Sequence, residues 1–169
     1  IELRLTEPFA PKEMTLYHGS NTKYDIIKPM TVNVGTRISS PRQSSFWTTD
    51  INGAKLFALD SIINKYCKEN GLEKISYMFD LKNTKMLVDR SRKSDFISIC
   101  KKVPIYVYEK TMSSKYIGRG HNIGLHEYTL DIPVRPDKTY KIYYTDLESV
   151  EFVDRRTIDI LMEKHKAGT

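Results

Sequence analysis

The sequence has few cysteines, one tryptophan and no long apolar run. Each of these features limits the kinds of protein that the chain can be. Its two cysteines, Cys67 and Cys100, have no partners at metal-ligand spacing, so we expect buried free thiols, as in a reducing compartment. A run of about 18 apolar residues, which a membrane-spanning helix needs, is absent. The N-terminal residues lack the basic start and apolar block of a secretory signal, which favours a cytoplasmic protein.

The remaining composition is that of a globular protein. The chain has 169 residues, of which 40% are hydrophobic and 28% charged, and it contains no internal repeat or low-complexity linker. These features predict a single domain over residues 1–169. The net charge of +6 favours an anionic partner such as a nucleotide, a nucleic acid or an acidic protein surface. The basic residues are spread along the chain, so a solvated surface explains most of this charge.

Short stretches of alternating or apolar residues recur along the chain and predict a β-rich fold. We expect strands over residues 14–17, 45–49, 74–81, 85–89, 104–110, 125–132, 138–145 and 147–154. We expect helices from residues 50–52 to Gly71, over residues 91–102 and from residue 155 onward. Residues 21–45 and 113–124 are expected to be mostly loop, and a loop of the first length is often functional. Together these elements predict an α+β fold with a largely antiparallel sheet.

Three residues are candidates for a site, although each has an ordinary explanation when taken alone. His18 follows a short strand and precedes Gly-Ser, a position typical of a structural histidine. Trp47 is the only tryptophan, and a lone tryptophan in a strand usually belongs to the core. Glu127 lies in an apolar-aromatic strand, where alternation places it on the face of Thr129. A half-buried carboxylate needs a partner or a function, whereas an exposed one at the rim of a sheet needs neither.

Taken together, three segments resemble the signature of ADP-ribosyltransferases. They are LYHGS at residues 16–20, SFWTTD at residues 45–50 and HEYTLD at residues 126–131. In order and spacing they are similar to the His–aromatic–Glu class, which includes poly(ADP-ribose) polymerases and diphtheria-like toxins. The resemblance covers about residues 14–132 and implies an ADP-ribosyltransferase-like split antiparallel β-sheet core with a few flanking helices. It also implies NAD⁺ as co-substrate and an NAD⁺-dependent pentosyl transfer, in which a mono-ADP-ribosyltransferase releases nicotinamide.

The resemblance implies a role for each residue of the first two segments. His18 would hydrogen-bond the adenosine ribose, which a neutral imidazole can do as donor or acceptor. Gly19 would admit the ligand close to its backbone and bind the nicotinamide carboxamide, and Ser20 would add a supporting hydrogen bond. The class usually has tyrosine in the second segment, and here Trp47 or, after a shift of one residue, Phe46 occupies that slot. Either ring would stack on the cationic nicotinamide.

Glu127 is the catalytic candidate of the third segment. Cleavage of the bond between nicotinamide and ribose passes through an oxocarbenium-like state, as in glycoside hydrolysis. A carboxylate that is hydrogen-bonded to the adjacent 2′-hydroxyl stabilises this state as positive charge develops on the ribose. It can also orient or deprotonate the incoming nucleophile. This chemistry requires no metal, and the sequence offers no convincing metal site.

Polar residues of the two predicted loops complete the candidate site. Arg37 and Arg42 either face the pyrophosphate or belong to a solvated loop, and both interpretations stay open. The loop before Glu127 contains Arg119, His121 and Asn122, and the corresponding segment of the family often recognises the acceptor. Its polar and basic content is compatible with a nucleic-acid or acidic acceptor.

Two alternatives to an ADP-ribosyltransferase remain. RNA 2′-phosphotransferases share the fold and use NAD⁺, but they rely on arginines rather than on a glutamate in the last strand. A catalytically inactive basic module for nucleotides or nucleic acid would explain Phe46 and Trp47 in place of the usual tyrosine. The acceptor, whether a protein, a nucleic acid or a small molecule, and the oligomeric state are not specified by the sequence. A toxin-like role would make the protein a secreted or delivered effector rather than a cytoplasmic enzyme.

Overall fold

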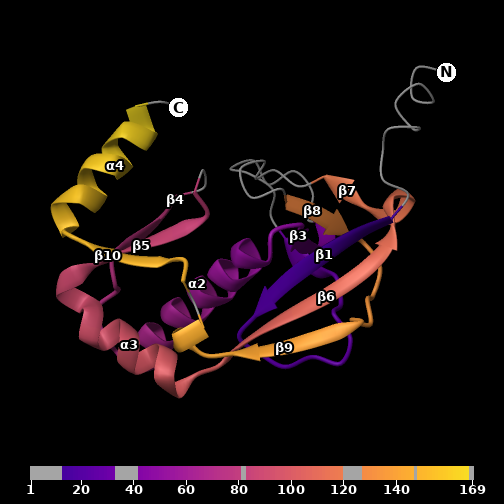
Figure 1. Ribbon diagram of the computed structural model, residues 1–169, viewed down its shortest axis with the longest axis horizontal. Coiled ribbons are helices and arrows are strands. Elements are labelled where there is room, and N and C mark those ends of the chain that lie inside the picture. Colours follow the sequence, from indigo (N-terminus) through magenta and orange to yellow (C-terminus); the bar gives the residue numbers. More distant parts are fainter. Residues whose placement is uncertain (1–12, 33–41, 81–82, 120–126, 147, 168–169) are drawn as a thin grey trace. The chain divides into compact units, whose positions relative to one another are not determined.

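A computed structural model describes residues 13–32, 42–80, 83–119, 127–146 and 148–167, and it has the expected α+β class (Figure 1). The strands are β1 (Glu13–Ser20), β2 (Met30–Val32), β3 (Arg42–Thr48), β4 (Tyr77–Asp80), β5 (Lys85–Asp89), β6 (Ile105–Ser113), β7 (Gly118–Arg119), β8 (Glu127–Leu130), β9 (Lys138–Ile142) and β10 (Val150–Val153). The α-helices of the described residues are α2 (Ile51–Glu69), α3 (Lys93–Lys102) and α4 (Arg155–Ala167). Short 3₁₀ helices lie at η2 (Arg90–Arg92), η3 (Ser114–Tyr116) and η5 (Tyr144–Asp146).

The larger sheet brings the three motif-bearing strands together. Its strand order is β7-β8-β3-β1-β6-β9, and β2 pairs with β3 outside this path. The β3–β8 ladder is antiparallel and pairs Trp47 with Tyr128 and Thr48 with Glu127. In the neighbouring antiparallel ladder, Tyr17 of β1 pairs with Thr48. The expectation of loop over residues 21–45 is wrong in part, because β2 and the first residues of β3 lie within it.

The smaller sheet is built from β10, β5 and β4, in that order. The β4–β5 pair is antiparallel, and a turn at Asn83-Thr84 precedes β5, with Thr84 at a φ of 51°. The β10–β5 pair is parallel, which departs from the largely antiparallel pattern expected from the sequence. Helix α4 packs against β4 and β5, and Ile158 of this helix is fully buried.

Helix α2 begins and ends where its sequence indicates. It starts at Ile51, directly after Asp50, and finishes at Glu69. Gly71 then has a φ of +63°, the left-handed conformation that often terminates a helix. The helix buries small and apolar side chains, and its buried residues include Ala54, Ala58 and Ile62. Cys67 and Cys100, on α2 and α3, are buried free thiols as expected.

The chain forms two compact units, each assembled from separate segments. The first comprises Ile1–His18, Tyr24–Ile51 and Tyr108–Thr139. The second comprises Gly19–Lys23, Asn52–Val107 and Tyr140–Thr169. The candidate residues His18, Trp47 and Glu127 therefore belong to the first unit, whereas Gly19 and Ser20 belong to the second.

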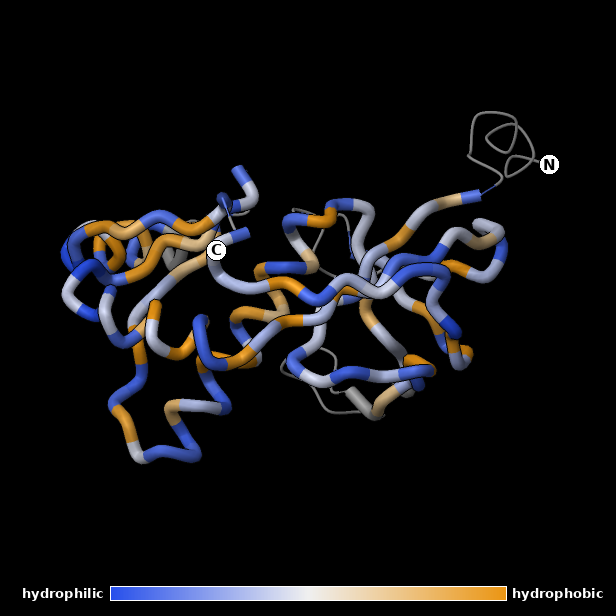
Figure 2. The backbone as a smooth tube through the Cα atoms, turned by 60° about the horizontal axis from the view of Figure 1, so that its bottom comes forward, coloured by the Kyte–Doolittle hydropathy of each residue, from blue (hydrophilic) through white to orange (hydrophobic). Residues whose placement is uncertain are grey.

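Apolar and polar residues alternate at short intervals along the backbone, as the interleaved orange and blue segments of Figure 2 show. Within the described part of the chain, every helix is too short or too polar to cross a membrane.

Candidate functional site

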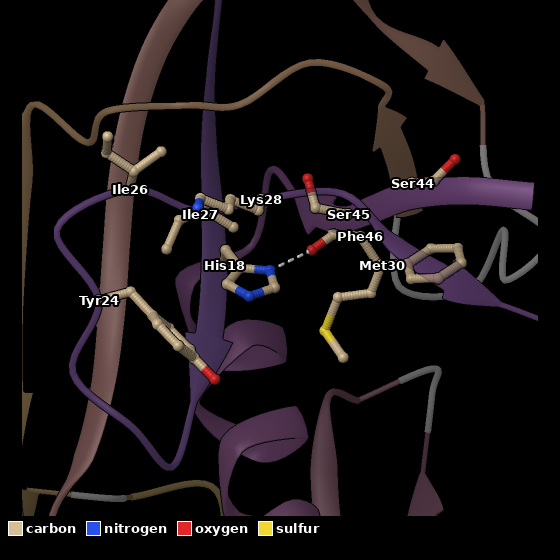
Figure 3. Close-up of a pocket in the computed structure, with 9 residues that line it drawn as sticks. All are labelled: His18, Tyr24, Ile26, Ile27, Lys28, Met30, Ser44, Ser45 and Phe46. Atoms are coloured by element: carbon tan, nitrogen blue, oxygen red, sulfur yellow. Dashed lines mark hydrogen bonds between the residues drawn. The ribbon is translucent and has the colours of Figure 1, made fainter.

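A cavity of about 390 Å³ lies in the first unit beside His18 (Figure 3). This volume falls in the range of roughly 300–1,000 Å³ that is typical of small-molecule sites. The residues around it come from the end of β1, the segment that leads into β2, and β3. They are His18, Tyr24, Ile26, Ile27, Lys28, Met30, Ser44, Ser45 and Phe46. The walls are thus mainly apolar, with a few polar groups, as expected of a site that binds a small organic molecule.

His18 presents one ring nitrogen to a backbone acceptor, which leaves the other nitrogen for a ligand. Its Nδ1 lies 2.6 Å from the carbonyl oxygen of Phe46. Because a carbonyl oxygen only accepts, Nδ1 carries the proton and Nε2 of the neutral ring holds a free lone pair. Burial lowers the pKa of His18 below its usual 6.5, although the bond to the Phe46 carbonyl acts in the opposite direction. The ring is therefore neutral at pH 7, and Figure 3 shows it between Tyr24 and Met30 with Nε2 turned away from Phe46.

Trp47 lies behind the His18 ring and is closed to solvent. Its side chain is 1% exposed, and its ring centroid is 5.2 Å from that of His18. The indole Nε1–H donates to the Ser45 hydroxyl over 2.7 Å. The indole therefore has no open face on which a ligand could stack, and its contacts instead fix the position of His18 and of the strand.

Phe46 is the aromatic residue of the second segment that reaches the cavity. In the β3–β8 ladder it pairs with Thr129, whereas Trp47 pairs with Tyr128. Successive residues of a strand point to opposite faces, so Phe46 shares a face with Glu127 and Trp47 does not. Of the two alternatives for the stacking ring, this geometry favours Phe46.

Glu127 begins β8 and is half-buried. It lies directly opposite Thr48 and diagonally from Phe46, a separation that long and aromatic side chains can span. Glu127 is not among the residues that line the cavity. Two strand spacings of about 4.8 Å separate β8 from β1, so Glu127 and His18 lie on strands about 10 Å apart.

Gly19 and Ser20 have structural partners within the second unit. A Cβ on Gly19 would lie 1.9 Å from the backbone oxygen of Ala54, so helix α2 occupies the space that the sequence analysis assigned to a ligand. The hydroxyl of Ser20 accepts a hydrogen bond from the backbone N–H of Thr22 over 3.0 Å, which forms a local turn. Both residues thus have roles in folding that do not require a ligand.

The basic candidates fall largely outside the described structure. Arg37, His121 and Asn122 lie outside the described residues. Arg42 and Arg119 lie at the start of β3 and the end of β7, but their side chains are not described. Among the described residues, no group of His, Cys, Asp and Glu is arranged to hold a metal ion.

Several residues around the cavity were missed by the motif comparison. Tyr24 and Met30 are 44% and 68% exposed at its edge, and Lys28 adds a positive charge. The backbone N–H of Tyr24 donates to the hydroxyl of buried Tyr108 over 2.6 Å, which anchors the segment. The only sequence signal for these residues was the length of the segment between the first two motifs.

The lowered pKa of buried His18 predicts that the stability of the protein depends on pH. In the unfolded chain its pKa is about 6.5, whereas burial lowers it in the folded protein, so the unfolded chain binds a proton more readily. Above pH 6.5, we therefore expect His18 to have no effect on the pH dependence of the melting temperature. Below pH 6.5, we expect the melting temperature to fall as the pH decreases. Melting curves from pH 5 to 8 measure the effect, and His18→Gln should remove that component. An identical pH profile in the variant would show that His18 titrates normally.

Comparisons of the chain with protein families, curated proteins and solved structures found no match.

Proposed function

We propose that the protein is a mono-ADP-ribosyltransferase, which transfers ADP-ribose from NAD⁺ to an acceptor and releases nicotinamide. The observation that carries the proposal is the adjacency of β1, β3 and β8. These strands hold the segments LYHGS, SFWTTD and HEYTLD, of which the last is more than 75 residues from the second. Three segments that resemble one signature thus meet in neighbouring strands, and two of them, LYHGS and SFWTTD, contribute residues to a cavity of suitable size.

The cavity supplies groups that suit the adenosine half of the dinucleotide. Nε2 of His18 is an acceptor for a ribose hydroxyl, and the apolar side chains of Tyr24 and Met30 flank the ring in Figure 3. Lys28 offers a cation for a phosphate at the same cavity. The register pairs Tyr17 with Thr48 and Thr48 with Glu127, so His18, the residue after Tyr17, points to the opposite face of the sheet from Glu127. The proposal therefore requires the nicotinamide half to extend beyond the cavity to the face that carries Glu127.

The proposed reaction uses Glu127 as a catalytic carboxylate. The bond between ribose C1′ and the nicotinamide nitrogen breaks, and its electron pair leaves with nicotinamide, which becomes neutral. The carboxylate hydrogen-bonds the ribose 2′-hydroxyl and stabilises the positive charge that develops at C1′. The acceptor then forms the new bond to C1′ and gives its proton to a base, a role within reach of Glu127.

Substitutions of the two aromatic residues test the proposal and the choice between them. Phe46→Ala should raise the KM for NAD⁺ by about tenfold, since stacking of a ring on a base contributes about 1–3 kcal/mol. Phe46→Tyr should keep the wild-type KM. Trp47→Phe should lower the melting temperature, because it leaves the Ser45 hydroxyl without its donor, and should change the KM little. The rate of nicotinamide release from labelled NAD⁺ gives the KM of the wild-type protein and of each of the three variants.

Two results would contradict the transferase function, and a third would contradict the choice of Phe46. No nicotinamide release by the wild-type protein with any acceptor, together with calorimetric binding of NAD⁺, would favour the inactive binding module. Removal of the 2′-phosphate from a phosphorylated RNA oligonucleotide would identify the phosphotransferase. A KM effect confined to Trp47→Phe would assign the stacking ring to Trp47.

A further inference from the structure

Thr129 has a buried hydroxyl without a partner, on the face of β8 that also carries Glu127. The residue is 4% exposed, and its Oγ1 has no hydrogen-bond partner among residues 13–32, 42–80, 83–119, 127–146 and 148–167. A buried hydroxyl that gives up water without gaining a partner destabilises a protein. A native structure retains such a group where it has a further use, so each one needs an explanation.

The surroundings of this hydroxyl connect it to the proposed catalytic face. Thr129 pairs with Phe46 on one side and with Gly118 of β7 on the other. Glu127, two residues earlier in β8, points to the same face. Within the described part of the chain, the Glu127 carboxylate has neither a hydrogen bond nor an ion pair. Among the residues that the structure describes, these two neighbouring polar groups on one face thus have no partner.

The Thr129 hydroxyl lies against Gly118 of β7. A Cβ at this position would lie 2.6 Å from Thr129 Oγ1 and would force the threonine side chain to move. Positions i and i+2 of a strand are about 6.6 Å apart, a distance that the side chains of Glu127 and Thr129 can bridge between them. The glycine therefore allows the Thr129 side chain to lie against β7, while its hydroxyl stays on the same face as Glu127.

We propose that Thr129 is a positioning residue for Glu127, whose carboxylate accepts a hydrogen bond from the Thr129 hydroxyl once NAD⁺ is bound. The inference rests on the proposed transferase function and adds a residue to its machinery. The hydroxyl holds the carboxylate toward the ribose and favours its ionised form, which is the form that stabilises the developing positive charge. The cost of the unpaired hydroxyl in the free protein is offset when the contact forms.

Replacement of the hydroxyl by a methyl group tests this role. Thr129→Val should raise the melting temperature of the free protein, because it removes an unpaired buried hydroxyl at nearly constant volume. It should lower kcat for nicotinamide release by about tenfold with little change in KM, since a hydrogen bond to a charged group is lost. The acidic limb of the pH–rate profile should move to higher pH. Thr129→Ser, which keeps the hydroxyl, should restore the wild-type profile.

A matched control separates these effects from those of any threonine in a strand. Thr15 on β1 shares a hydrogen bond of 2.8 Å with Thr111 at an exposed position, so Thr15→Val should change neither kcat nor the pH profile. A lower melting temperature for Thr129→Val, or wild-type kcat and pH profile, would overturn the positioning role while leaving the transferase function standing. An inactive wild-type protein would instead overturn the proposed function, and the positioning role with it.

Discussion

Glu127→Gln is expected to lower the rate of nicotinamide release by roughly 10³-fold, the largest effect on activity of any single substitution. The amide has nearly the shape of the carboxylate but no charge, so it cannot stabilise the positive charge that develops on the ribose. Binding of NAD⁺ in the ground state should change little, since the cavity residues that would hold the adenosine half are unaffected. Single-turnover release of nicotinamide and calorimetric binding of NAD⁺ separate the two quantities.

Glu151→Gln is the matched control for this substitution. Glu151 is also a strand glutamate, on β10, and it forms an exposed ion pair with Lys85 over 3.7 Å. Exposed ion pairs contribute little to stability, so we expect this variant to keep wild-type activity and melting temperature. Equal losses of activity in the two variants, or full activity of Glu127→Gln, would remove Glu127 from the mechanism.

The sequence predicted the elements around the site because local signals mark their ends. Asp50 stands directly before α2, and Gly71 follows it with the positive φ that such a terminator provides. The strands on either side of Asn83-Thr84 were also predicted from local signals, since residues 74–81 and 85–89 are two separate apolar runs. Each of these features depends on residues that are neighbours in the sequence, so the pattern of residues was sufficient to predict where the elements end.

Features that depend on pairing between distant segments could not be predicted. Alternation shows that Phe46 and Trp47 point to opposite faces, but it does not show which of them shares a face with Glu127. That assignment requires the register of β3 against β8, in which Phe46 pairs with Thr129. The parallel pairing of β10 with β5 is a second example, because residues 85–89 and 150–153 carry no local mark of direction.

Gly19 belongs to the first motif, but packing against α2 explains the glycine at this position. The motif alone suggests that the side chain is missing so that a ligand can approach. The structure shows that the backbone of α2 approaches instead: an added Cβ would lie 1.9 Å from the Ala54 oxygen, 2.9 Å from its carbonyl carbon and 3.2 Å from the Ala58 Cβ. Real Cβ atoms essentially never come within 3.0 Å of another heavy atom, so the strand or the helix would have to shift.

Gly19→Ala is therefore expected to lower the free energy of unfolding by roughly 3 kcal/mol, at the upper end of overpacking effects, because the obstacle is backbone. Urea denaturation measures the change. Ala58→Gly in the same chain should not restore stability, since the closest contact is the Ala54 carbonyl rather than the Ala58 side chain. Gly71→Ala is the control: no atom lies within 4 Å of its added Cβ, and only the positive φ costs about 1 kcal/mol. A Gly19→Ala protein as stable as the wild type would show that α2 does not approach β1 this closely.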